Sequence, residues 1–154
     1  MVLGMSLHTY TVLHVVITLV ELLAGLLVVL ALMGGKKSGL SGLFLVSAAL
    51  TSITGFLFPF HGVTPGIVVG VLSLVTTGLA AVAGGHRKLF AIAAVVTLYF
   101  DAFVTIAQLF EHVPSLHALA PTGGGPVFGG AQGVLLIVFV VLGWKANKGY
   151  AAGS

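Results

Sequence analysis

The chain has 154 residues, of which 58% are hydrophobic and only 6% are charged. Because an ordinary soluble domain carries about 25% charged residues, this composition excludes a soluble enzyme, a disordered chain and a nucleic-acid-binding protein. Cysteine is absent, which also excludes disulfides, thiolate metal sites and cysteine nucleophiles. The class that remains is a small integral membrane protein.

Five apolar stretches have about the length of a membrane-spanning helix, which needs roughly 20 mainly apolar residues. Clusters of glycine, proline and lysine separate them, as expected of turns. The predicted spans are 10–33, 40–58, 66–83, 89–110 and 127–144. The sequence therefore predicts an all-α fold, an integral membrane bundle of five transmembrane helices that forms one domain over residues 1–154.

The basic residues predict the orientation of this bundle. All six lie in the links on one side of the predicted spans or after the last span: Lys36, Lys37, Arg87, Lys88, Lys145 and Lys148. Lysine and arginine stay on the cytoplasmic side of a membrane. We therefore expect the N-terminus outside and the C-terminus in the cytoplasm, which requires an odd number of spans.

Two acids, Glu21 and Asp101, lie inside predicted spans near mid-depth, and intramembrane acids are functional candidates by default. Each belongs to a polar stripe whose spacing of i, i+4, i+7 and i+11 keeps it on one helical face. The stripe of the first span consists of His14, Thr18, Glu21 and Gly25, and that of the fourth consists of Asp101, Thr105, Gln108 and His112.

The two striped spans run in opposite directions, so both stripes fall in the outer half of the bilayer, while 26–32 and 89–96 are apolar. We infer a polar pocket that opens outward above an apolar floor. Its predicted ligand-binding residues are His14, Thr18, Glu21, Tyr99, Asp101, Thr105, Gln108 and Gln132. The structural alternative is that the two acids bond to each other or to Thr and Gln neighbours and fix the helix register.

Five of the six histidines fall outside or in the outer half of the predicted bundle. Imidazoles with carboxylates bind Zn, Cu or Fe, and a haem needs one or two axial histidines. The candidate metal ligands are His14, His61, Glu111 and His112. No H-x-x-x-H or E-x-x-H pattern occurs within a span, so the alternative is that these histidines are surface groups.

Four segments of the chain are similar to those of a known protein family. They are 54–62 (TGFLFPFHG), 116–122 (LHALAPT), the start at 7–9 and the fourth-span segment 98–108. The chain resembles a family of small, uncharacterised bacterial integral membrane proteins over its whole length. The resemblance implies a multi-pass protein of the bacterial inner membrane and implies no activity. It also implies that a charge at position 101 is not required, since relatives often carry an amide there.

Together these observations favour a non-enzymatic membrane protein. It would bind a lipid-like or quinone-like ligand in the outer-half pocket or act as an accessory subunit of a larger membrane complex. Its expected partners are the lipid bilayer and other membrane subunits or further copies of the chain, with no nucleic acid. The alternative is a membrane redox protein that uses haem or a divalent metal. A third hypothesis, a proton-coupled transporter, is disfavoured by the apolar inner half.

Overall fold

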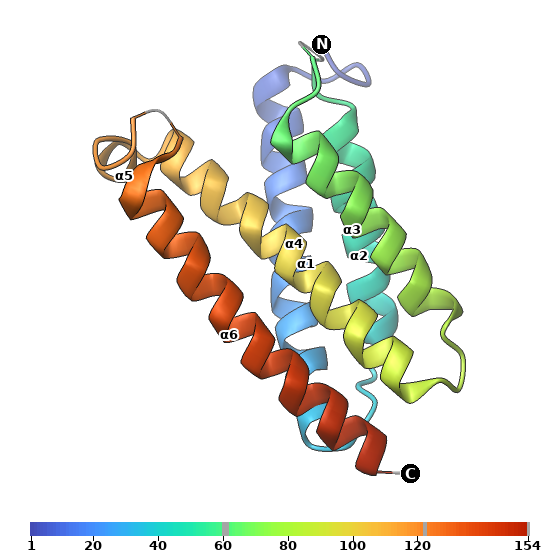
Figure 1. Ribbon diagram of the computed structural model, residues 1–154. Helices are drawn as coiled ribbons and strands as arrows, with labels where there is room; N and C mark the ends of the chain where they lie inside the picture. Colours follow the sequence, from blue (N-terminus) through green and yellow to red (C-terminus); the bar gives the residue numbers. More distant parts are fainter. Residues whose placement is uncertain (60–61, 122, 154) are drawn as a thin grey trace.

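The computed structural model describes residues 1–59, 62–121 and 123–153. Over these residues the chain forms helices and contains no strand. The helices are α1 (Leu7–Met33), α2 (Ser41–Phe56), α3 (Pro65–Val82), α4 (Arg87–His112), α5 (Pro114–His117) and α6 (Gly125–Ala152). Apart from the short α5, successive helices run in alternate directions along one bundle (Figure 1).

Four of the described helices, α1, α3, α4 and α6, are long and apolar enough to cross a membrane. Large apolar side chains cover their outer faces, with Leu23, Val82 and Ile137 each at least 65% exposed. The predicted all-helical class is thus confirmed, and these helices indicate a multi-pass membrane protein. The second predicted span is the shorter α2, whose 16 residues extend about 24 Å at 1.5 Å per residue. The number of spans stays a prediction.

Some helices extend beyond the predicted span limits, α1 at its start and α6 at its end. α1 begins at Leu7, before the predicted 10, where the Ser6 side chain accepts a hydrogen bond from the Thr9 N–H at 3.1 Å. α6 continues from the predicted limit at 144 to Ala152. Lys145 and Lys148 therefore lie on a helix and not in a tail.

The two ends of the bundle differ in charge. The N-terminal end holds the start of α1, the α2–α3 link and α5, and the opposite end holds the α1–α2 link, the α3–α4 link and the C-terminal turns of α6 (Figure 1). We call this opposite end the basic end, because it carries all six basic residues: Lys36, Lys37, Arg87, Lys88, Lys145 and Lys148. The charge asymmetry expected from the sequence is thus present along the bundle axis.

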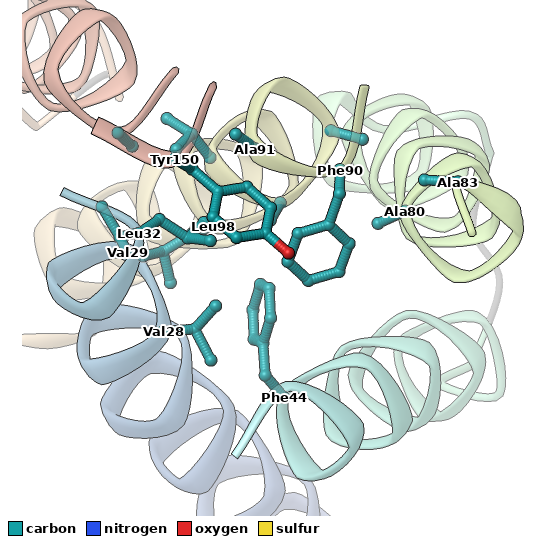
Figure 2. Packing of buried hydrophobic residues seen from close by; sticks show 14 of the residues in the cluster. Val28, Val29, Leu32, Phe44, Ala80, Ala83, Phe90, Ala91, Leu98 and Tyr150 are labelled. Carbon is teal, nitrogen blue, oxygen red and sulfur yellow. The ribbon is translucent and has the colours of Figure 1, made fainter. Parts of the chain in front are cut away.

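An apolar core fills the bundle toward the basic end. Its rings and branched side chains come from α1, α2, α4 and α6, and Figure 2 shows the rings of Phe44, Phe90 and Tyr150 gathered between these helices. The centroids of the Phe90 and Tyr150 rings lie 6.1 Å apart in an edge arrangement. The Arg87 guanidinium lies 4.9 Å from the Tyr150 ring and donates to the Tyr150 carbonyl oxygen at 3.3 Å. The last turns of α6 are therefore part of the core.

Glycines allow the last turns of α6 to approach α1 closely. A Cβ at Gly149 would lie 2.9 Å from the Leu32 carbonyl oxygen and closer still to that of Met33. α1 ends next to this contact in a turn where Gly35 has a φ of +77°, a conformation that glycine adopts without steric cost. The Lys36 N–H closes the turn by donating to the Ala31 carbonyl oxygen at 3.0 Å. Backbone contact thus joins the first and last long helices.

Candidate functional site

Two carboxyl groups meet inside the bundle, one from each of the polar stripes. Glu21 on α1 is 0% exposed and Asp101 on α4 is 6% exposed. The Glu21 carboxyl lies against the side chains of Asp101 and of Thr51 on α2. The structure therefore brings the two intramembrane acids together between helices that run in opposite directions.

Asp101 is held by a hydroxyl from a third helix. The Ser73 Oγ on α3 donates to the Asp101 Oδ2 at 2.7 Å, and Ser73 is itself completely buried. One turn nearer the basic end, the hydroxyls of Thr76 and Thr97 are hydrogen-bonded at 2.8 Å. We call this set of side chains from α1 to α4 the polar centre: Glu21, Thr51, Ser73, Thr76, Thr97 and Asp101.

Glu21 lacks the partners that Asp101 has. Neither Glu21 carboxyl oxygen makes a hydrogen bond of good geometry within the described residues, and the Thr51 Oγ1 beside it is also buried without one. An unsatisfied buried polar group costs about 1–3 kcal/mol, and a buried charge without compensation costs more. The polar centre therefore has spare acceptor capacity for a proton or a small cation.

The polar centre continues toward the N-terminal end along α1. The His14 Nδ1 and the Thr54 Oγ1 on α2 are hydrogen-bonded at 2.7 Å, and His14 is half-buried. The Tyr10 hydroxyl donates to the Thr54 carbonyl oxygen at 2.7 Å. Thr18, between His14 and Glu21, donates to its own helix at the His14 carbonyl oxygen at 3.0 Å. Polar side chains of α1 and α2 thus continue from Glu21 toward the N-terminal end.

Toward the basic end the polar centre is closed by apolar side chains. Gly25 lies one turn from Glu21, and a Cβ there would be 2.7 Å from both Phe44 Cε2 and Leu98 Cδ1. Phe44 is completely buried, and Leu98 is 2% exposed. Val28 and Leu32, on the next turns of α1, are also completely buried. The apolar floor expected from the sequence corresponds to this closely packed region.

The other residues of the predicted ligand-binding set spread away from the acid pair. On α4, the Thr105 hydroxyl donates to the Asp101 carbonyl oxygen at 2.7 Å, whereas Gln108 is exposed. Gln132 on α6 donates to the Phe103 carbonyl oxygen at 3.0 Å. The Thr105 contact joins two neighbouring turns of α4, and the Gln132 contact joins α6 to α4.

Tyr99 faces a different part of the molecule. Its ring packs against Phe139 on α6, with centroids 5.6 Å apart, and it lines a groove between α4 and α6. The predicted set therefore divides between the interior of α1–α4, the exposed end of α4 and the contact between α4 and α6.

The predicted ligand-binding set did not include the hydroxyls of α3 or Thr51, the α2 residue beside Glu21. Ser73, Thr76 and Thr77 are the polar side chains of an otherwise apolar helix, and their position in the middle of the predicted span was the available signal. Thr51 lies in a run with Ser52 and Thr54 that does not indicate which hydroxyl faces α1. Which of these hydroxyls faces α1 depends on the rotation of α2 about its own axis.

The candidate metal ligands are dispersed in the part of the chain that the structure describes. No three histidine, aspartate or glutamate side chains converge there. Glu111 and His112 are exposed at the end of α4, where the His112 Nδ1 is hydrogen-bonded to the Gln108 carbonyl oxygen at 3.1 Å. His61 lies outside the described residues. The haem or metal site stays a prediction.

Searches of the chain against protein-family models, curated proteins and solved structures find no match.

Proposed function

We propose that the chain is a non-enzymatic, five-span protein of the bacterial cytoplasmic membrane whose Glu21–Asp101 pair binds one proton. The observation that carries the proposal is the complete burial of Glu21 beside a second acid, with no hydrogen-bond partner for its own oxygens among the described residues. Two adjacent carboxylates cannot both be ionised in a medium of low dielectric constant. A single shared proton removes one charge and supplies the missing donor.

The distribution of polar groups supports access to this proton from one side. His14, Thr18 and Thr54 lie between Glu21 and the N-terminal end, whereas Phe44 and Leu98 pack beneath it. Since basic residues stay on the cytoplasmic side, the basic end is the cytoplasmic end in this proposal. The proton then enters and leaves from outside the cell.

One-sided access favours a binding role over transport. A proton-coupled carrier exposes its site alternately to the two sides of the membrane, whereas the core between the polar centre and the basic end is mainly apolar among the described residues. A proton-binding subunit of a larger membrane complex needs access for the proton from the outer side only. The broad apolar faces of the helices, such as that of α6, are compatible with partner helices.

Infrared difference spectroscopy between acidic and alkaline buffers tests the proposal directly. The chain has only three acidic side chains, so few carboxyl bands arise. We expect a protonated-carboxyl band that shifts in D2O and disappears or moves in both Glu21→Gln and Asp101→Asn. The matched control is Glu111→Gln, which removes the exposed acid and leaves this band unchanged.

The same spectra can contradict the proposal. If Glu111→Gln removes the whole side-chain carboxyl signal, the buried pair exchanges no proton. If Glu21→Gln and Asp101→Asn each remove a separate band and leave the other band unchanged, the two acids do not share one proton. Sidedness is measured in proteoliposomes of one orientation, where only a pH step at the N-terminal face should change the band.

A further inference from the structure

A second feature, separate from the polar centre, is a groove on the surface between α4 and α6. Its volume is about 330 Å³, near the lower limit of the roughly 300–1,000 Å³ typical of ligand pockets. Side chains that line it include Ile92, Val96, Tyr99, Val140, Trp144 and Asn147. The lining is mainly apolar, and Ile92, Val140 and Trp144 are each more than half exposed. The size and chemistry fit a single acyl chain.

Positive charge stands at the end of this groove that lies nearest the basic end. Lys88 lies one helical turn before Ile92 on the same face of α4, in a shallow hollow that also includes Ala151 of α6. The Lys148 Nζ lies 5.2 Å from the centroid of the Trp144 ring, at the side of the groove. Two ammonium groups, one from each helix, therefore flank the end of the apolar groove.

No acidic side chain lies near these lysines in the part of the chain that the structure describes. Its three acidic side chains are Glu21 and Asp101 in the polar centre and Glu111 at the exposed end of α4. Arg87 is already engaged with Tyr150 through its ring and its carbonyl oxygen, which leaves the lysines as the available cations. A basic hollow beside membrane-spanning helices is suited to an anionic headgroup.

We infer that the groove between α4 and α6 binds an anionic phospholipid, with one acyl chain against Ile92, Val140 and Trp144 and the phosphate between Lys88 and Lys148. The occupant is a lipid because the apolar groove and the basic hollow lie one helical turn apart on the same face of α4. That arrangement matches an amphiphile with a negative head. The site is independent of the acid pair and of the proposed function.

Trp144 provides a direct probe, because it is the chain's single tryptophan and lines the groove. The protein is placed in phosphatidylcholine nanodiscs that contain increasing fractions of phosphatidylglycerol with brominated acyl chains, which quench tryptophan on contact. Brominated phosphatidylcholine serves as the comparison lipid. We expect quenching by the anionic lipid at a several-fold lower mole fraction.

Two lysines form a matched pair of variants. Lys88→Ala should reduce the preference for the anionic lipid about fivefold, since a lysine near a membrane surface contributes about 1 kcal/mol. Lys145→Ala should leave it unchanged, because Lys145 lies about 160° around α6 from Asn147. Lys148 is not replaced in this assay because its removal would alter Trp144 emission directly. Val140→Phe should narrow the groove and weaken quenching by both lipids.

Three results would overturn the inference. Equal quenching by the two brominated lipids would show that the groove does not select charge. If Lys88→Ala and Lys145→Ala reduce the preference for the anionic lipid equally, the preference arises from the overall positive charge of the basic end and not from the groove. Absence of quenching by either lipid would mean that another protein surface, such as a second copy of the chain, covers Trp144.

Discussion

Replacing Gly25 by alanine probes the packing that closes the bundle beneath the acid pair. The new Cβ would lie 2.7 Å from both Phe44 Cε2 and Leu98 Cδ1, whereas carbon atoms pack at about 3.5–4.0 Å. Both side chains must therefore leave their rotamers, at about 0.5–1.5 kcal/mol each. The free energy of unfolding should fall by about 1–3 kcal/mol, as in other overpacked cores. This corresponds to roughly a 5- to 150-fold change in the folded-to-unfolded ratio.

The assay is unfolding in mixed micelles by titration with sodium dodecyl sulfate, followed by circular dichroism. The control is Gly78→Ala on α3, where a Cβ would meet nothing within 4 Å. It should leave stability unchanged or raise it by up to about 1 kcal/mol through helix propensity. Phe44→Leu should restore much of the loss in the Gly25→Ala background but lower stability in the original chain.

Two results would refute this reasoning about Gly25. One is a Gly25→Ala variant as stable as Gly78→Ala. The other is an equal effect of Phe44→Leu in both backgrounds, since the predicted clash requires the two substitutions to be coupled.

Three further predictions test other contacts and the topology. Ser73→Ala removes the hydroxyl that donates to Asp101 and should lower the free energy of unfolding by about 0.6–1.7 kcal/mol. If the same titration shows no loss, the hydrogen bond between Ser73 and Asp101 does not stabilise the fold. Gly149→Ala should lose more stability than Gly25→Ala, because the opposing atoms are backbone carbonyls that cannot rotate away; a smaller loss would contradict this. Because the chain has no cysteine, single substitutions His8→Cys and Lys145→Cys report topology through a membrane-impermeant maleimide. His8→Cys should react in intact cells and Lys145→Cys only after permeabilisation, and labelling of both from one side would exclude five spans.

The helices were largely predictable because hydropathy and turn residues act locally along the chain. The predicted start and end of span 40–58 lie within a few residues of α2 (Ser41–Phe56). The end of α6 was not predictable in this way. Its turns beyond Trp144 are held by Gly149 against α1 and by Tyr150 in the core, and these contacts join opposite ends of the sequence.

The acid pair was partly predictable for a similar reason. Helical spacing placed Glu21 and Asp101 each on a polar face, and the cost of exposing an acid to lipid turns both faces inward. The contribution of Ser73 depends on the rotation of α3. A serine can satisfy its hydroxyl on its own helix backbone, as Ser47 does, so its polarity alone does not specify a direction.

The contact between Gly149 and α1 can form only after α6, the last long helix, has been synthesised. The polar centre is built from α1, α2, α3 and α4, while α6 follows them in the sequence. During synthesis the acid pair can therefore form before the last long helix leaves the ribosome. α6 then completes the apolar core from the basic end, where Tyr150 enters beside Phe90. A nascent chain arrested before α6 would retain the carboxyl pair but leave the side of the core that Tyr150 covers open to lipid.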